Sequence, residues 1–265
     1  MTGPGVAMSP LLTQVGLLAR RSVVRTFRQP ANVVFAFFFP LLLLAVNVGG
    51  LDAATRIPGF PSDSFLDFAL AFTFMQGALF ATTNAGTDLA RDIQTGFLNR
   101  LALTPLRGTA LLAGQLAGVV VLGLAQSILY LSVGLAAGAR LEAGVAGVVV
   151  LLVLAALIAT AFGAIGAFLA LRTGSGEAVQ GLFPLLFVLL FLSSMNLPRN
   201  LIEIEWFRTV ATINPVSYLI EGLRSLIISG WDAQALALAF GIGLGLAAAA
   251  LAAASLALGG RLART

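Results

Sequence analysis

The 265-residue chain has no cysteine and no histidine, and all fifteen of its basic residues are arginine, so lysine is absent as well. Without cysteine there is no disulfide, no thiolate nucleophile and no iron–sulfur ligation. Without cysteine and histidine a zinc site lacks its usual ligands. Without lysine the P-loop signature G-x-x-x-x-G-K-[ST] cannot occur. We therefore expect no metal site, no cofactor bound by this chain, and no enzymatic activity.

Charge is scarce as well. Only 10% of the residues are charged and 59% are hydrophobic, whereas a soluble domain carries about a quarter charged residues. Lipid is the solvent that suits such a chain. The net charge of +4 does not indicate a nucleic-acid partner, because the arginines lie in short segments between apolar runs rather than on one polar face.

Six apolar runs approach the length of about 20 residues that a membrane-spanning helix needs. They are Ala31–Val48, Phe65–Gly86, Leu111–Ala136, Ala143–Leu171, Val179–Met195 and Ala233–Leu258. The first and fifth contain Pro40 and Pro184, which a membrane helix tolerates when its neighbours satisfy the freed carbonyl. The sequence predicts an all-α membrane protein with six transmembrane helices.

Orientation follows from the arginines. With the N-terminus in the cytoplasm, ten of the fifteen lie on the cytoplasmic side, together with only three of the eleven acidic residues. The positive-inside rule selects this arrangement, with both termini cytoplasmic in a multi-pass protein of the cell membrane.

The middle of each predicted span carries no Asp, Glu or Arg. Ion-coupled transporters usually place such groups at mid-depth, so energy is expected to arrive from outside the lipid. A passive channel would need a filter and an intramembrane enzyme a catalytic constellation, and neither stands out.

Glycine pairs at four-residue spacing would let helices approach closely. They are Gly114 and Gly118, Gly134 and Gly138, and Gly241 and Gly245, although chance explains any single pair in a chain with 29 glycines. No internal repeat or linker divides the sequence, and a single domain over residues 1–265 is expected.

Residues 10–30 alternate apolar residues with Arg20, Arg21, Arg25 and Arg28. The spacing predicts an amphipathic helix at the cytoplasmic interface, with its arginines toward lipid phosphates. A solvated basic leader is the alternative.

Residues 88–110 mix charge with apolar side chains and predict a short cytoplasmic helix that ends at Thr104-Pro105. Such a segment can dock a soluble partner or lie against the protein's own membrane base, and the pattern leaves both open.

Residues 196–232 are too polar to span the membrane and too apolar for an open loop. They predict two short helices broken at Asn214-Pro215, forming a re-entrant hairpin in the outer leaflet. Glu221 and Arg224 are three residues apart and are expected to be able to pair.

Two stretches, RDIQTGFLNRLALTPLRGTALLAGQLA (91–117) and INPVSYLIEGLRSL (213–226), resemble segments of the type-2 ABC exporter permeases. That group includes daunorubicin-resistance-type drug exporters and permeases for polysaccharide and teichoic acid. With the six-span order, the resemblance covers nearly the whole chain. It implies two permease copies, as a homodimer or as a heterodimer with a related permease, and two ABC ATPase subunits that hold ATP and Mg.

The resemblance also implies roles for particular residues. ATPase coupling would fall to Gln94, Thr95, Gly96, Phe97, Leu98, Arg100, Leu101, Thr104 and Pro105. The external gate motif would comprise Asn214, Pro215, Tyr218, Glu221 and Arg224. The substrate pathway would be lined by residues that include Phe38, Asn47, Phe72, Met75, Gln76, Phe187 and Phe191.

An uncharged pathway suits a hydrophobic or amphiphilic, drug-like or lipid-like cargo. The alternative is a permease for a lipid-linked polysaccharide or a teichoic-acid-like polymer. A continuous row of exposed aromatics would favour sugar, and the sequence shows no clear row.

Overall fold

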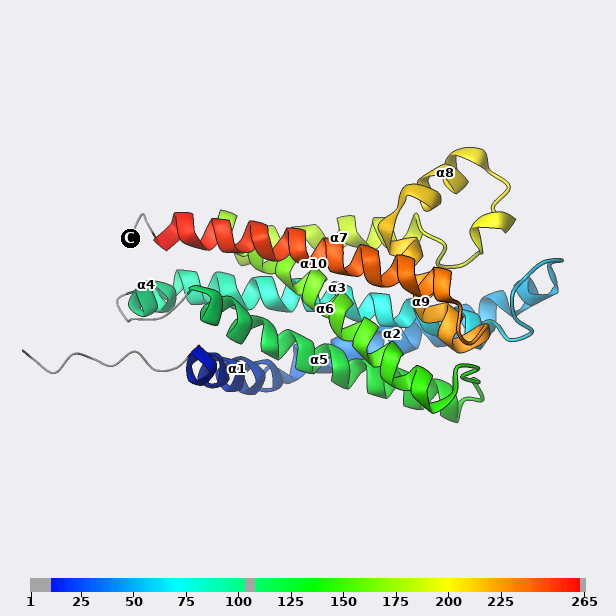
Figure 1. Ribbon diagram of the computed structural model, residues 1–265, viewed down its shortest axis with the longest axis horizontal. Coiled ribbons are helices and arrows are strands. Elements are labelled where there is room, and N and C mark those ends of the chain that lie inside the picture. The colour runs from blue at the N-terminus through cyan, green and yellow to red at the C-terminus, as the bar shows by residue number, and fades with distance from the viewer. Residues whose placement is uncertain (1–10, 103–107, 263–265) are drawn as a thin grey trace, which may run out of the picture.

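The computed structural model describes residues 11–102 and 108–262, which form helices and turns without a strand. Most of the helices run along the long axis of one bundle (Figure 1). The α-helices are α1 (Leu11–Phe27), α2 (Pro30–Leu51), α3 (Phe65–Gln94), α4 (Phe97–Ala102), α5 (Gly108–Ala136), α6 (Gly144–Thr173), α7 (Gly176–Phe191), α8 (Glu205–Ile213), α9 (Pro215–Ile228) and α10 (Ala233–Leu262). Two short 3-10 turns, η1 (Asp52–Arg56) and η2 (Arg199–Leu201), complete the described chain.

Five helices of the described chain are long and apolar enough to cross a membrane. The first runs from Val33 in α2 to Arg56 in η1, and the other four are α3, α5, α6 and α10. The predicted fifth span is the apolar helix α7, which has only 16 residues. At 1.5 Å per residue it is about 24 Å long, shorter than a typical hydrocarbon core. The all-helical membrane fold is thus confirmed, and a full crossing by α7 stays a prediction.

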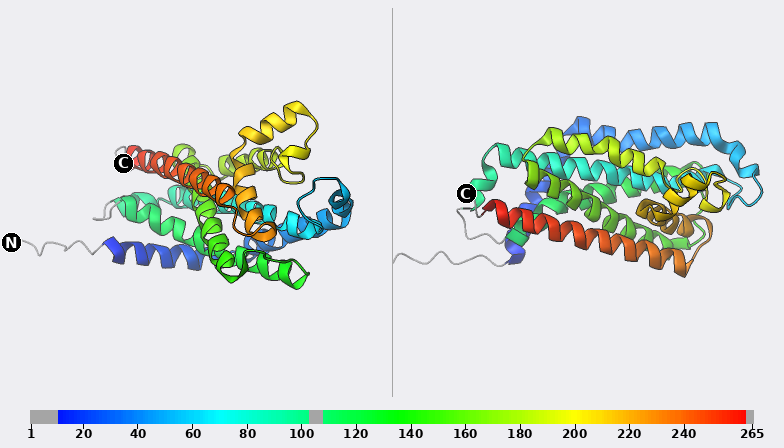
Figure 2. Two further views of the ribbon diagram at one scale, coloured as in Figure 1. Left: turned by 45° about the vertical axis from the view of Figure 1, so that its right-hand side comes forward. Right: turned by 90° about the horizontal axis from the view of Figure 1, so that it is seen from above.

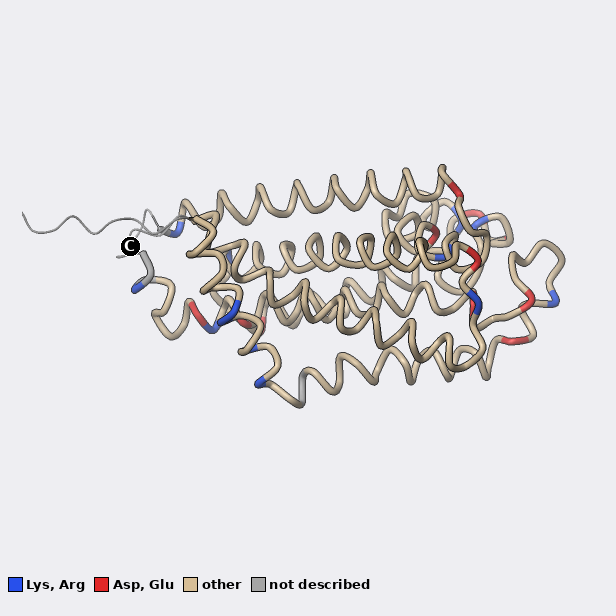
Figure 3. The backbone as a smooth tube through the Cα atoms, turned by 60° about the horizontal axis from the view of Figure 1, so that its bottom comes forward, with Lys and Arg blue, Asp and Glu red and all other residues tan. Residues whose placement is uncertain are grey.

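Charged residues gather at the two ends of the bundle and leave its middle uncharged (Figure 3). The start of α1, the short helix α4 and the end of α10 lie at one end, and α8 lies at the other (Figures 1 and 2). This arrangement puts the first and last described helical ends on the same side, as the six-span interpretation requires.

The centre of the bundle is α3, whose side chains from Phe68 to Thr82 are all buried. Its closest neighbour is α6, which crosses it where two glycines meet. A Cβ atom on Gly166 would lie 1.9 Å from the carbonyl oxygen of Thr82, and one on Gly86 would lie 2.8 Å from the carbonyl oxygen of Gly166. Backbone meets backbone at this crossing, so only glycine fits.

The glycine pairs expected from the sequence behave differently from one another. Gly114 and Gly118 lie under α1, where a Cβ atom would come within 2.3 and 2.4 Å of Leu18 and Ser22. Gly134 lies against Leu70, whereas Gly241 and Gly245 have no neighbouring atom within 4 Å. Close approach is thus confirmed for the first pair, and it serves α1 rather than a contact between two spans.

Pro40 lies inside α2 and has no N–H for the carbonyl of Ala36, four residues earlier. Two side chains of α5 donate to that carbonyl instead: the amide nitrogen of Gln126 at 2.8 Å and the hydroxyl of Tyr130 at 2.7 Å. The freed carbonyl is therefore satisfied by a neighbouring helix, as expected, and the same bonds hold α2 to α5.

We expect Gly166→Ala to destabilise the protein, because the new methyl group would overlap main-chain atoms that cannot rotate away. Overpacking of this kind costs about 1–3 kcal/mol. Thermal unfolding in detergent, followed by circular dichroism, measures the change.

The matched control is Gly245→Ala, also within a helix but in open space. It should be neutral or stabilise by up to about 1 kcal/mol. Equal midpoints for the two variants would contradict the proposed backbone contact.

Candidate functional site

Helix α1 packs along α5 with its polar side inward. Gln14, Ser22 and Thr26 are buried, and the Ser22 hydroxyl donates to the carbonyl of Gln115 at 2.8 Å. Leu12 and Leu17 are exposed on the outer side. Because the apolar side faces away from the protein, it is available to lipid, as expected for an interfacial helix.

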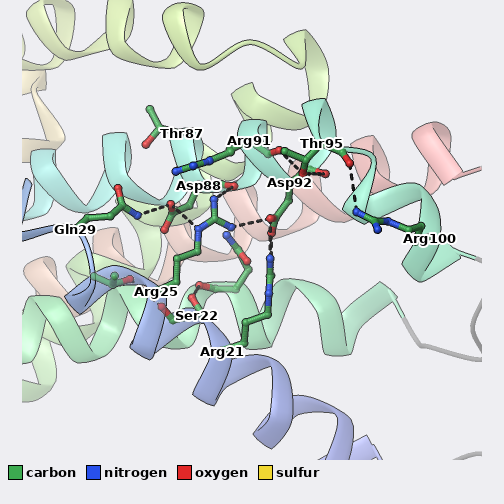
Figure 4. A network of polar contacts seen from close by, with 12 residues as sticks. Arg21, Ser22, Arg25, Gln29, Thr87, Asp88, Arg91, Asp92, Thr95 and Arg100 are labelled. Atoms are coloured by element: carbon green, nitrogen blue, oxygen red, sulfur yellow. Dashed lines mark hydrogen bonds and ion pairs between the residues drawn. The ribbon is translucent and has the colours of Figure 1, made fainter.

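Two of the three arginines of α1, Arg21 and Arg25, are bound by carboxylates at the end of α3 (Figure 4). Arg21 donates to both oxygens of the buried Asp92, at 3.0 and 2.8 Å. Arg25 donates to the same carboxylate at 2.7 Å and pairs with Asp88 at 3.1 Å. The hydrogen bonds to Asp92 raise the pKa of the Arg21 guanidinium above its ordinary value. Arg20 and Arg28 are exposed.

The two arginines are four residues apart, and so are the two carboxylates, so each helix presents its two charged groups on one face. Gln29 adds a hydrogen bond from its amide to Asp88 at 3.0 Å. A buried carboxylate with only one partner would be costly, and Asp92 has two. These contacts fix α1 to the end of α3.

The segment predicted to couple to an ATPase continues directly from this network. Gly96 has a φ of +68°, which turns the chain from α3 into α4. Gln94, Thr95 and Arg100 are exposed, and Arg100 donates to the carbonyl of Thr95 at 3.4 Å. They form an exposed corner at this end of the bundle.

The rest of the predicted coupling set is divided. Leu98 is buried in the chain's own core, and Phe97 lies under the Arg21 guanidinium, 3.8 Å from the ring centroid. Leu101 belongs to α4, but its side chain, Thr104 and Pro105 lie outside the described residues. The apolar side chains described here thus face the protein, and the exposed coupling surface is polar.

The opposite end of the bundle contains the Asn214-Pro215 break. The structure confirms two helices, α8 and α9, separated there, with Pro215 opening α9. The Asn214 side chain accepts from the N–H of Val216 at 2.9 Å and donates to the carbonyls of Leu189 and Leu192 at 2.7 and 3.1 Å. Asn214 therefore caps two helices, the start of α9 and the end of α7.

Arg224 completes the end of α7. It is 6% exposed and donates to the carbonyls of Ser194 and Met195 at 3.0 and 2.9 Å, and to that of Phe68 in α3 at 3.2 Å. Its guanidinium also lies 3.5 Å from the centroid of the Phe68 ring. This one side chain of α9 thus joins its own helix to α3 and to the turn after α7.

The expected pairing of Glu221 with Arg224 is wrong. Arg224 is occupied by main-chain carbonyls, and Glu221 accepts instead from Arg199 at 2.8 Å. The Arg199 guanidinium lies over the Tyr218 ring at 4.4 Å, and the Tyr218 hydroxyl donates to the carbonyl of Thr212 at 2.8 Å. Correct helical spacing permitted the pair, but the unpaired carbonyls after α7 competed for the arginine.

The residues expected to line a substrate pathway fall into two groups. Phe72, Met75 and Gln76 of α3 are buried within this chain. Phe38 and Phe191 are exposed, whereas Asn47 and Phe187 are half-buried. The exposed members lie on α2 and α7, and nothing in the described chain covers them.

Aromatic rings connect these two helices. Phe39 of α2 contacts Phe187 of α7 at 6.4 Å between centroids, and Phe187 contacts Phe191 at 5.2 Å. Phe80 of α3 contacts Phe39 and also Phe183 of α7, at 6.0 and 5.4 Å. The sequence analysis did not find this row, because its members come from three helices.

Sequence reasoning also did not pair Asp88 and Asp92 with α1. The signal was present: two acidic residues lie one turn apart at the end of the second predicted span, and two arginines lie one turn apart in the predicted interfacial helix.

The fold and these two ends define a multi-pass membrane protein built from helices. The family model for the ABC-2 type transporter matches residues 13–228, and the chain therefore belongs to that family. Permeases of this kind work with a separate ABC ATPase subunit and in a dimeric arrangement. The expectation that this chain is a non-catalytic transport permease is thereby confirmed.

Three relatives illustrate the similarity. The putative transport permease ycf38 of Porphyra purpurea is 28% identical over 228 residues, which cover 83% of this chain and 76% of the relative. The daunorubicin resistance ABC transporter permease protein DrrB1 of Streptomyces coeruleorubidus is 29% identical over 75% of this chain and 69% of its own length. The probable doxorubicin resistance permease DrrC of Mycobacterium tuberculosis is 24% identical, with 83% and 78% covered.

We expect Arg224→Leu to lower the thermal stability strongly, because three buried carbonyls lose their donor. Each unsatisfied group costs about 1–3 kcal/mol. The unfolding temperature of Arg224→Lys should fall between those of the wild type and Arg224→Leu, since an ammonium group lacks the planar fork of a guanidinium.

The control is Arg208→Leu on α8, an exposed position that should change stability by less than about 0.5 kcal/mol. If Arg224→Leu unfolded at the same temperature as Arg208→Leu, the assigned role of Arg224 would be wrong.

Proposed function

We propose that this chain is the transmembrane subunit of an ATP-driven exporter in the cell membrane, which moves a hydrophobic or amphiphilic compound outward. The observation that carries the proposal is the exposed corner of Gln94, Thr95 and Arg100. It is joined to the bundle by Arg21 and Arg25 through Asp92, and by the Gln94 amide, which donates to the carbonyl of Gly174 at 3.1 Å. A partner that pushes this corner acts on α1, α3 and the turn between α6 and α7.

The orientation supports the same proposal. Both termini and α4 would face the cytoplasm, where the ATPase subunits and their ATP and Mg are found. The end of the bundle with α1 and α4 holds ten of the fifteen arginines in the topology drawn from the sequence. Two ATPase copies and two permease copies, identical or related, would make up the transporter.

The test is co-purification with the partner ABC ATPase. We expect Arg100→Glu to weaken ATPase retention at least tenfold and to lower ATP turnover in lipid discs, because it reverses a charge on the exposed corner. Leu101→Asp examines the neighbouring position on α4.

Arg56→Glu, which makes the same charge change at the opposite end in η1, is the matched control and should retain the ATPase. If Arg100→Glu and Leu101→Asp retained the ATPase as well as this control does, docking at this corner would be refuted.

The cargo is proposed from the uncovered faces of α2 and α7. Phe35 and Phe38 of α2 and Phe191 of α7 are 55%, 62% and 47% exposed, and Asn47 is the polar side chain proposed beside them. Such a surface suits an apolar or amphiphilic molecule at the seam with a second permease.

Two relatives are named for daunorubicin and doxorubicin resistance, so an anthracycline is the first probe. We expect inverted vesicles with the complete transporter to accumulate it on ATP addition, and Phe38→Ala to reduce the initial rate severalfold. Accumulation that is unchanged by removal of the ATPase would contradict export.

One observation favours the alternative cargo, a lipid-linked polysaccharide or a teichoic-acid-like polymer. The ring contacts from Phe39 through Phe187 to Phe191 form an aromatic row, in which Phe191 is exposed and the other two are half-buried. The row consists of phenylalanine, which offers no hydrogen-bonding group to a sugar hydroxyl, so we place this candidate second. ATPase stimulation by a lipid-linked glycan but not by the anthracycline would reverse the order.

A further inference from the structure

We propose that the arginine-lined hollow between α1 and the end of α3 binds the phosphate headgroup of an anionic membrane lipid. The hollow has a volume of about 510 Å³, and five arginines line it: Arg20, Arg21, Arg25, Arg28 and Arg91. We call it the basic hollow. The inference rests on the proposed function only in that this end of the bundle faces the cytoplasm.

The protein balances only part of the positive charge in the basic hollow. Asp88 and Asp92 are occupied by Arg21 and Arg25. Arg20, Arg28 and Arg91 are exposed, and among the described residues no hydrogen bond or ion pair engages their guanidinium groups. Three cations thus remain for an external anion, while the two paired arginines are held in place by the carboxylates.

The level of the basic hollow favours lipid. Arg28 comes immediately before the first span, which α2 begins at Pro30, and Arg91 lies in the last turns of α3. Figure 4 shows Arg91 close to the Arg25 and Asp88 contacts, where α1 meets α3. This is the depth at which a spanning helix leaves the hydrocarbon, and basic pockets there suit anionic headgroups.

The walls favour a lipid over a free phosphate ion. Leu17 and Val24 line the same hollow and are 65% and 42% exposed. They continue the apolar outer side of α1, which includes Leu12 and Phe27. A headgroup on the arginines would leave its acyl chains beside these side chains, whereas a hydrated ion would leave them in water.

The basic hollow and the proposed ATPase contact have no residue in common. The exposed corner of Gln94, Thr95 and Arg100 begins at the last residue of α3, and none of these three residues lines the hollow. We therefore assign lipid to the hollow and the ATPase to the corner, and the two assignments are tested apart.

The experiment uses the full-length permease in a neutral detergent, without the ATPase. Phosphatidylglycerol and phosphatidylcholine are titrated separately, and native mass spectrometry gives the apparent affinity of each. The variant Arg20→Gln/Arg28→Gln/Arg91→Gln removes the three unpaired charges and keeps Arg21 and Arg25. The control Arg56→Gln/Arg140→Gln/Arg208→Gln removes three exposed arginines at the opposite end.

We expect the wild type to prefer phosphatidylglycerol, and the triple variant to bind it on the order of a hundredfold more weakly. The control should stay within about twofold of the wild type, and phosphatidylcholine binding should be equal in all three proteins. Equal phosphatidylglycerol affinity in the triple variant and the wild type would overturn the proposal.

Two further arms distinguish other occupants. Displacement of phosphatidylglycerol by millimolar inorganic phosphate would identify a free-anion site and overturn the assignment to lipid. Loss of ATPase co-purification in the triple variant, with lipid binding intact, would identify an ATPase contact instead. If the triple variant loses lipid affinity while Arg100→Glu still retains the ATPase, this inference stands and docking at the exposed corner falls.

Discussion

A chain in hydrocarbon has to satisfy its polar groups from within, because no water reaches them. The short helix α7 shows how much depends on this constraint. Its last carbonyls, and those of the turn that follows, receive donors from Asn214 and Arg224. The hairpin of α8 and α9 thereby makes a 16-residue helix possible at this depth. Pro40 poses the same problem inside α2, and Gln126 and Tyr130 resolve it.

The same constraint explains where the charges are. The ion pairs of the described chain lie at the two ends of the bundle, Arg21 and Arg25 at one and Arg199 at the other (Figure 3). The middle is held by close packing instead, above all where Gly86 of α3 meets Gly166 of α6. Because packed helices move as units rather than deform, the two polar ends are the places where a partner can bias the arrangement.

Composition and periodicity predicted the elements well, because hydrophobic length depends on the chain alone. Five helices long and apolar enough to span a membrane, the amphipathic helix α1 and the break at Asn214-Pro215 followed from the sequence. Contacts between distant segments did not. Helical spacing allowed Glu221 to pair with Arg224, but the carbonyls of Ser194 and Met195 compete for that arginine only after folding. The aromatic row also needed α2, α3 and α7 to be placed together.

Helix α3 joins the two ends. Near its start, the carbonyl of Phe68 accepts from Arg224, and near its end Asp92 accepts from Arg21 and Arg25. The 24 residue steps from Phe68 to Asp92 span roughly 36 Å of continuous helix, and the side chains along most of that length are buried. A helix packed on all sides transmits a displacement along its axis better than it absorbs one. A force on the corner at Gln94–Arg100 would therefore reach the hairpin through α3 without any charge inside the membrane having to move.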